Sequence, residues 1–369
     1  MMKLKKVAKA TTATAVSVLA VKKGLDFYNG QYQTLKSVSR LDNNIYMMDY
    51  SFDYCLDNLL TKGVKNTAEL LAYVGDATLF GARFLKLGTG SFACSTFDAF
   101  TENGDHLFGR NFDYKKAPCM IVWTHPENAY KSIAVADCNF MLYGNVNKPL
   151  SSLNRLQALL APYCCMDGMN EKGLAIGILE LKSKPTNQNS GKTDISTTVL
   201  IRAVLDKCAT VDEAVELFKS FDVHDAFFCC YHYQITDALG KSVIIEYVNN
   251  EMRLFYPQKC DDSARAYQCA ANFFLAEDGD NTKAFGYDRA EKMNKKLTES
   301  GTVLNEEQAM ELLGELQLNY QHETYPWRVI TLWSAVYNSN TLTAKIAAGL
   351  DYNNVYSFSV TEPCKVIRQ

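Results

Sequence analysis

The feature that most constrains the fold is a pair of alternating segments joined by an Asn-Gly dipeptide. Residues 91–100 (SFACSTFDAF) and residues 106–114 (HLFGRNFDY) flank Asn103 and Gly104. Asn-Gly between two such runs is the strongest short-range signal for a β-hairpin. The sequence therefore predicts two antiparallel strands at this point of the chain.

The register of this hairpin places a carboxylate next to a cysteine. If Asn103 and Gly104 are the central turn residues, Cys94 pairs directly with Asp113, with Cβ atoms about 4.5–5.5 Å apart. A carboxylate raises the pKa of a neighbouring thiol, but it would hold an α-amino group of the same residue in place. An α-amine, with its usual pKa of about 7.7–8.0, is a serviceable general base beside its own thiol. That chemistry requires the chain to begin at Cys94; the alternative is a buried structural cysteine beside a strand-end carboxylate.

The chain changes character near residue 90. Residues 1–87 are mostly helical in pattern, and Asn66 is the expected N-cap of an apolar-periodic helix. Residues 88–369 contain antiparallel strand patterns with helices grouped between them, including a helix capped by Thr210 with Glu213 three residues later. This order predicts an α+β layered domain preceded by a separate helical segment.

Composition excludes several classes of function. Lysine and arginine number 38 against 41 acidic residues, so there is no basic surface for nucleic acid. The 12 cysteines and five histidines show no C-x-x-C or H-E-x-x-H spacing, which argues against a metal site. We expect a small-molecule partner and no metal or cofactor.

The first 25 residues have a basic start followed by a short uncharged run. The run from Ala10 to Val21 is too short to span a membrane. It has the form of a weak signal peptide, but threonines dilute it and no small-x-small cleavage site follows. We therefore expect a cytoplasmic protein without a stable membrane span; the alternative is secretion or membrane association through residues 1–25.

A glycine-rich stretch before the hairpin suggests a second function. Gly88, Gly90 and Ala93 satisfy the loose dinucleotide-binding pattern G-x-G-x-x-A. That reading needs a helix to begin at once, with its N-terminus facing the pyrophosphate. An alternating strand follows instead, so the cofactor interpretation is rejected.

Three blocks of the sequence resemble a known family. They are the Cys-Ser-Thr run at Cys94, the segment HLFGRNFDY and the segment DGMNEKGLAIGILEL at residues 167–181. Together they resemble the choloylglycine hydrolase group of N-terminal-nucleophile amidases, which includes bile salt hydrolases, penicillin V acylase and the acid amidase and ceramidase enzymes. The resemblance implies a four-layer αββα domain.

The resemblance also implies roles for individual residues. Cys94 matches the nucleophile, whose freed α-amine serves as the base. Arg110 and Asp113 match the pair that orients the nucleophile and its amine. Asn272, in the segment CAANFFLA, matches the oxyanion asparagine, and Arg328, in YPWRVIT, matches a late arginine near the thiol.

Two departures from the simplest members of the family bear on substrate and processing. Bile salt hydrolases have an asparagine where this chain has Glu180, and a glutamate resembles the acid amidase and ceramidase branch instead. Cys94 also lies behind 93 residues, so residues 1–93 are expected to be a helical propeptide and residues 94–369 the catalytic domain.

The hairpin register and the family resemblance disagree about one residue. Simple alternation places Arg110 opposite Phe97, on the other face of the hairpin from Cys94. Its implied role would then need a β-bulge, for which Gly109 is the natural position.

These observations together predict a cysteine amidase that cleaves itself before Cys94 and hydrolyses a linear N-acyl amide through a thioester. Three alternatives stay open: an acyltransferase on the same scaffold, a bile salt hydrolase, and an unprocessed binding protein without activity. The sequence does not specify the acyl group or the amine, and it leaves a homo-oligomer open.

Overall fold

The computed structural model describes six stretches of the chain: residues 26–88, 90–143, 155–226, 229–257, 265–321 and 327–367. Within them the strands form two large sheets. The nine-stranded sheet has the order β1 (Ser39–Arg40), β2 (Ile45–Tyr50), β5 (Cys119–Thr124), β6 (Ser132–Asp137), β7 (Cys165–Asn170), β8 (Ala175–Leu181), β11 (Cys230–Thr236), β12 (Ser242–Val248) and β13 (Glu251–Phe255).

The second sheet of the described residues carries the predicted hairpin. Its order is β14 (Cys269–Ala270), β3 (Ala93–Phe100), β4 (His106–Lys115), β16 (Arg328–Asn338), β17 (Thr343–Ala348), β18 (Tyr356–Ser359) and β19 (Val366–Ile367), with β15 (Asn319–Gln321) beside β16. A short parallel pair, β9 (Thr193–Ser196) and β10 (Phe221–His224), lies apart from both sheets.

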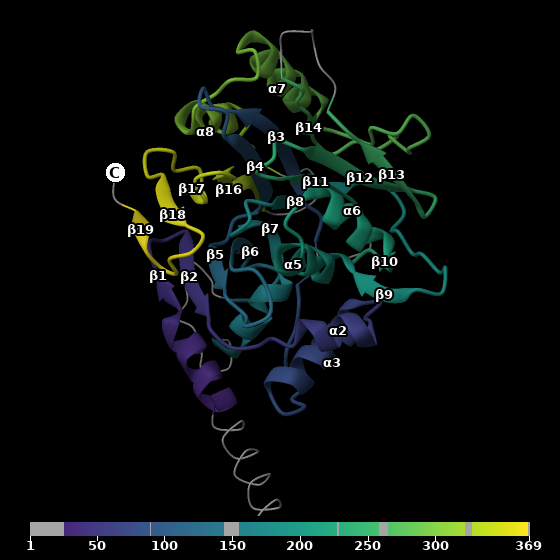
Figure 1. The fold of residues 1–369 in the computed structure, drawn as a ribbon, viewed down its shortest axis with the longest axis vertical. Helices are drawn as coiled ribbons and strands as arrows, with labels where there is room; N and C mark the ends of the chain where they lie inside the picture. The colour runs from purple at the N-terminus through teal and green to yellow at the C-terminus, as the bar shows by residue number, and fades with distance from the viewer. Residues whose placement is uncertain are drawn as a thin grey trace, which may run out of the picture.

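Helices cover the outer faces of the two sheets. Helices α7 (Tyr287–Glu299) and α8 (Glu306–Glu315) pack on β3, β4 and β16, whereas α5 (Thr197–Lys207) packs on β7 and β8, and α6 (Val211–Lys219) packs on β11. Strand β3 contacts β8 of the other sheet. Figure 1 shows α7 and α8 together at the top of the molecule, well apart from α5. The chain therefore has helix, sheet, sheet and helix layers.

The helix ends follow the capping patterns of the sequence. Asn66 caps α3 (Thr67–Thr78) by accepting a hydrogen bond from the amide of Glu69. Thr210 caps α6 in the same way, and Glu213 returns a bond to the amide of Ala209. Both predicted caps are confirmed.

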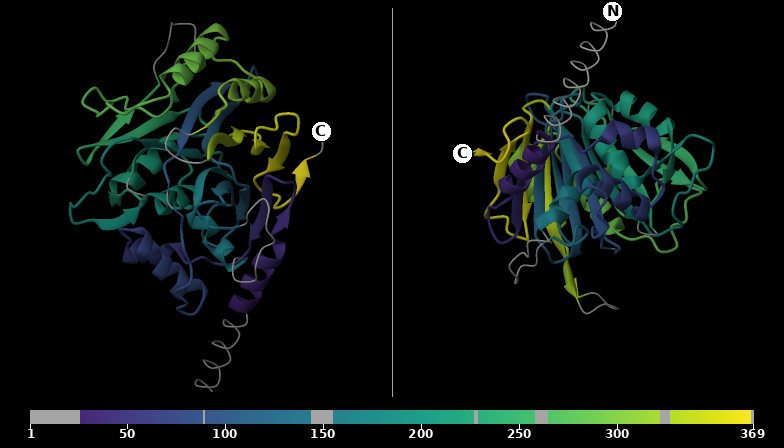
Figure 2. Two further views of the ribbon diagram at one scale, coloured as in Figure 1. Left: turned by 180° about the vertical axis from the view of Figure 1, so that it is seen from behind. Right: turned by 90° about the horizontal axis from the view of Figure 1, so that it is seen from below.

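The N-terminal region differs from the predicted helical appendage. Residues 26–37, α2 (Leu56–Lys62) and α3 are helical, but β2 lies inside the nine-stranded sheet and pairs in parallel with β5 along its whole length. In Figures 1 and 2 the N-terminal strands lie beside the C-terminal strands β18 and β19. The region before Cys94 therefore contributes a strand to the nine-stranded sheet and is not a separate helical segment.

The predicted register of the hairpin is wrong by one residue. Strand β3 pairs with β4 so that Cys94 lies opposite Phe112, and Ala93 lies opposite Asp113. The connection spans residues 101–105, because the amide of Thr101 bonds to the carbonyl of Asp105 instead of the chain turning tightly at Asn-Gly. Because the loop has five residues in place of the expected two, every cross-strand pair of the hairpin is shifted by one residue from the predicted register.

The corrected register also removes the predicted bulge at Gly109. Arg110 lies opposite Thr96 and therefore on the same face as Cys94. The pairing of β3 with β4 is regular, and Gly109 is needed because a methyl group there would overlap the ring of Phe97. The irregularity lies between β4 and β16, next to Thr331.

Candidate active site

Cys94 is buried between the two sheets near the start of β3. Its thiol accepts a hydrogen bond from Nη2 of Arg110 at 3.5 Å. The guanidinium of Arg110 is itself buried; its Nη1 donates to the Ile178 carbonyl at 2.5 Å, and its Nε lies 2.5 Å from Asp167. Arg110 therefore links Cys94 to strands β7 and β8 of the facing sheet.

Asp167 fixes the orientation of Arg110. Besides the ion pair, its carboxylate accepts hydrogen bonds from Nε1 of Trp333 at 2.9 Å and from the hydroxyl of Tyr337 at 2.5 Å. Sequence reasoning missed this residue, because no role was assigned to it within the segment of residues 167–181. The signal was present as an acidic residue in one of the three blocks that carry the family resemblance.

Asp113 is also fully buried, and it faces the residue that precedes Cys94. Its Oδ1 accepts a hydrogen bond from Thr331 at 2.5 Å, and its Oδ2 lies 3.2 Å from Nη1 of Arg289. Burial raises the pKa of Asp113 to about 6, although Arg289 and Thr331 act to lower it. The carboxylate is thus ionised at neutral pH and loses its charge in mild acid.

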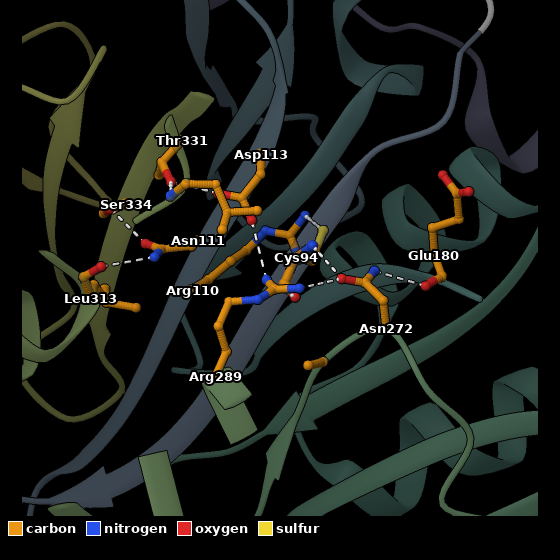
Figure 3. Close-up of polar contacts among 12 residues, drawn as sticks. Cys94, Arg110, Asn111, Asp113, Glu180, Asn272, Arg289, Leu313, Thr331 and Ser334 are labelled. Atoms are coloured by element: carbon orange, nitrogen blue, oxygen red, sulfur yellow. Dashed lines mark hydrogen bonds and ion pairs between the residues drawn. The ribbon is translucent and has the colours of Figure 1, made fainter. Parts of the chain in front are cut away.

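Arg289, on α7, occupies the centre of the site. Its Nη1 donates to the main-chain carbonyl of Cys94 at 2.6 Å, and its Nη2 donates to Oδ1 of Asn272 at 2.8 Å (Figure 3). Together with its ion pair to Asp113, these bonds hold the backbone of Cys94 from the side opposite Arg110.

Arg328 does not join this cluster. It is exposed at the start of β16, where its guanidinium donates to the side chain and the carbonyl of Asn319. The arginine close to the thiol's backbone is instead Arg289. Sequence reasoning missed it because no helix was predicted over Tyr287–Glu299.

Asn272 contacts the main-chain nitrogen of Cys94. Its Oδ1 accepts a hydrogen bond from the amide of Cys94 at 2.9 Å, and its Nδ2 donates to the Glu180 carbonyl at 2.8 Å. The side chain of Glu180 points away from Cys94 and binds the two residues Ser91 and Phe92 of the leader. Four of the six predicted site residues, Cys94, Arg110, Asp113 and Asn272, therefore lie together, and Glu180 adjoins them through its main-chain carbonyl while its side chain binds the residues before Cys94.

The surroundings of the Cys94 thiol disfavour its thiolate form. Burial raises its pKa to about 12; Arg110 and Arg289 lower it, whereas Asp113 and Glu180 raise it further. A thiol in this environment is protonated at neutral pH, and only the thiolate is a strong nucleophile. Nucleophilic attack by this thiol therefore requires a base that removes its proton.

Two features are absent from the described residues. No group of three or more histidine, cysteine, aspartate or glutamate side chains in this part of the chain could hold a metal ion. The described helices also include none that is long and apolar enough to cross a membrane.

Comparison with known proteins gives a family match over more than half of the chain. Residues 99–352 match the family model of acyl-coenzyme A:6-aminopenicillanic acid acyl-transferase. The match begins after Cys94 and includes the other five predicted site residues.

Two curated proteins are similar over shorter stretches. The bile salt hydrolase/transferase of Clostridium perfringens is 27% identical over 178 residues, which are 44% of this chain and 50% of that protein. The penicillin V acylase of Pectobacterium atrosepticum is 29% identical over 143 residues, which are 34% of this chain and 37% of that protein. The chain thus spans about half or less of the length of these relatives.

Solved structures share the fold. A mutant conjugated bile acid hydrolase from Clostridium perfringens superposes with a TM-score of 0.51 at 15% identity, covering 75% of this chain and 97% of that one. Penicillin V acylase from Agrobacterium tumefaciens gives a TM-score of 0.52 at 18% identity, covering 73% and 87%. These similarities confirm the predicted four-layer αββα fold.

Proposed function

Because the chain belongs to the acyl-coenzyme A:6-aminopenicillanic acid acyl-transferase family, we propose that it is a self-processing cysteine amidase. It cleaves its own chain before Cys94 and then hydrolyses a linear N-acyl amide. The observation that carries this proposal is the set of contacts on Cys94. The nitrogen of Cys94 bonds to Asn272, its carbonyl bonds to Arg289, and its thiol bonds to Arg110.

The first reaction is an N-to-S acyl shift. The Cys94 thiol attacks the Ala93 carbonyl, the peptide C–N bond breaks, and the thiol proton passes to the Cys94 nitrogen. Water then hydrolyses the thioester, which leaves a carboxylate on Ala93 and a free α-amine on Cys94. Burial raises the pKa of this thiol to about 12, so little thiolate is present and the attack is slow. A reaction that occurs once per molecule tolerates a slow step, whereas turnover requires a base that forms the thiolate.

Cleavage itself supplies that base. Asp113 lies directly opposite Ala93, so the departure of Ala93 leaves the new α-amine of Cys94 beside a buried carboxylate. Asn272 Oδ1, which accepts from the Cys94 nitrogen before cleavage, can continue to do so. An α-amine with its usual pKa of about 7.7–8.0 accepts the thiol proton near neutral pH.

Turnover then follows the chemistry of an acyl-enzyme. The thiol attacks the substrate carbonyl, the ammonium of Cys94 gives its proton to the leaving nitrogen, and water hydrolyses the thioester. We assign Asn272 Nδ2 as an oxyanion donor, a contribution of about 3–4 kcal/mol. In the uncleaved chain this group donates to the Glu180 carbonyl, so it has to turn toward the substrate.

Intact mass spectrometry of the purified chain tests this function. We expect a species that begins at Cys94, its loss in Cys94→Ala, and its retention in the matched control Cys364→Ala, whose cysteine lies near the C-terminus. Amide hydrolysis should appear only with the processed species. A full-length chain that persists and still hydrolyses amides would refute the mechanism.

The family description and the name of one relative support a second candidate, acyl transfer. The family model describes an acyl-transferase, and the relative from Clostridium perfringens is called a hydrolase/transferase. On this scaffold the Cys94 thioester would pass to an amine instead of water. Addition of candidate amines during turnover separates the two, because transfer produces a new amide whereas hydrolysis produces only the free acid.

A further inference from the structure

The residue two positions before Cys94 fills an aromatic slot. The ring of Phe92 is only 3% exposed and packs against Phe112, Phe140 and Tyr231, with centroid distances of 4.9, 6.0 and 5.8 Å. Phe112 lies directly opposite Cys94, so the slot adjoins the nucleophile. The slot is formed by residues that follow the cleavage point and is therefore retained after cleavage.

Glu180 binds the polar atoms of the same leader segment. Its buried carboxylate accepts hydrogen bonds from the main-chain amide of Phe92 at 2.6 Å and from the hydroxyl of Ser91 at 2.6 Å. Lys182 lies 2.5 Å from the same carboxylate and is partly exposed. Glu180 thus has two donors from the residues before Cys94 and one from Lys182, just beyond the end of β8.

The leader segment is also the acyl group of the first reaction. In self-cleavage the thiol of Cys94 takes its acyl group from Ala93, and in turnover the same thiol takes one from the substrate. Residues Ser91–Ala93 therefore occupy the acyl side of the site until they are displaced. Their displacement opens the aromatic slot and removes two donors from the Glu180 carboxylate, which keeps its ion pair to Lys182 and favours a ligand that supplies other donors.

From these contacts we propose, on the basis of the function proposed above, that the acyl pocket of the processed enzyme retains the shape and polarity of Ser91–Ala93. Its substrates are amides with a dipeptide-like acyl group. They carry an apolar ring for the slot and an ammonium or N–H group where Phe92 presents its amide to Glu180. Glu180 is then a residue that binds the acyl group through its side chain.

A cavity on the outer side of Ser91 shows that this end of the pocket is accessible. It has a volume of about 510 Å³, and its lining includes Ser91, Glu180, Lys182, Lys184 and Lys283. A charged amino group bound to Glu180 would lie at the inner edge of this cavity, so it does not have to be transferred into an apolar interior. Longer acyl groups can extend into the same space.

Three anilides test the proposal on the processed enzyme. Phe-Ala p-nitroanilide supplies both the ring and the amino group; 3-phenylpropanoyl-Ala p-nitroanilide lacks only the amino group; Gly-Ala p-nitroanilide lacks only the ring. We expect kcat/KM for the first to exceed that for each of the others by roughly tenfold or more, the value of one hydrogen bond to a charged group or of one buried ring.

A substitution at Glu180 separates binding from other effects. Glu180→Gln should reduce the ratio between the first two substrates to within about threefold, since a neutral acceptor loses the charge-assisted bond. The matched control Glu311→Gln, an exposed glutamate on α8, should leave the ratio unchanged. Cys94→Ala protein purified in the same way excludes contaminating peptidases.

The outcomes distinguish this inference from the proposed function. If the chain is processed and hydrolyses 3-phenylpropanoyl-Ala p-nitroanilide as fast as Phe-Ala p-nitroanilide, the inference is wrong and the amidase function stands. The inference is also wrong, and the amidase function stands, if the processed chain hydrolyses only simple acyl anilides such as phenoxyacetyl p-nitroanilide. If the chain is not processed, the proposed function itself is overturned. If the processed chain hydrolyses none of these anilides, the inference about the acyl pocket is wrong.

Discussion

Substitution of Arg289 tests the site most directly, because this residue makes three contacts within it and no sequence motif marked it. Arg289→Met removes the buried partner of Asp113 and the donors to the Cys94 carbonyl and to Asn272. Loss of one partner from a buried ion pair costs about 3–5 kcal/mol, since the remaining charge is left uncompensated. The three bonds share one side chain, so we expect a loss in this range and not the sum of three separate terms.

The assay is urea unfolding in a Cys94→Ala background, in which every chain stays uncleaved. Arg289→Met should lower the unfolding midpoint by an amount that corresponds to about 3–5 kcal/mol. Adding Asp113→Asn should recover about 1 kcal/mol or more, because the uncompensated carboxylate is then absent. Arg328→Met is the matched control: this arginine is exposed, and its loss should cost within about 0.5 kcal/mol.

Self-processing supplies a second measurement for the same pair of variants. With Cys94 restored, Arg289→Met should fail to release the chain that begins at Cys94, whereas Arg328→Met should be processed normally. Equal unfolding midpoints for the two variants, or a processing defect confined to Arg328→Met, would refute the assignment of Arg289 to the site.

Three further predictions concern the leader and its surroundings. Gly90→Ala should slow self-cleavage at least tenfold in time courses of intact mass, because its methyl group would overlap the Tyr114 hydroxyl and displace the leader. The pKa of Asp113, raised to about 6, means that this group favours the folded state below about pH 4 and loses up to about 3 kcal/mol as pH rises through 6; Asp113→Asn should remove that dependence from unfolding curves measured between pH 4 and 7. After cleavage the leader should stay bound through gel filtration, because Tyr54 donates to buried Asp206 at 2.5 Å and β2 lies in the sheet; elution of the two pieces as separate species would contradict this.

The sequence predicted the local parts of the site and failed where loop length decides the outcome. The hairpin and its two strands follow from alternation and the Asn-Gly dipeptide, whereas the roles of Cys94 and Asp113 were implied by the family resemblance. The partner of Cys94 depends on whether the loop has two or five residues, and that depends on how Thr101 and Asp105 bond to each other. A one-residue error there reversed the expected face of Arg110.

The residues missed by sequence reasoning are joined by long-range contacts. Arg289 meets Cys94 across 195 residues of chain, and Trp333 meets Asp167 across 166. Periodicity indicates which face of an element is buried, but it does not indicate which element lies against that face. No helix was predicted over Tyr287–Glu299, and Arg289 within it is only 3% exposed.

The prediction of a separate helical segment before Cys94 failed for a related reason. Strand β2 (Ile45–Tyr50) is a six-residue apolar run within a helical region, and a run of that length is compatible with either structure. Its parallel pairing with β5 joins two segments that are far apart in sequence, with no turn between them to mark the register. Only the assembled sheet decides its conformation.

Under the proposed function, residues 26–93 have three separate roles, and these are consistent with a segment that is cleaved at Cys94 and still retained. Strand β2 completes a sheet, so loss of the whole leader would expose an apolar edge. Phe92 closes the aromatic slot, and the peptide bond before Cys94 withholds the amine that would activate the thiol. Cleavage before Cys94 would free the α-amine and allow Phe92 to leave the aromatic slot. It would not disturb the pairing of β2, because β2 and the cleaved bond lie on different sheets.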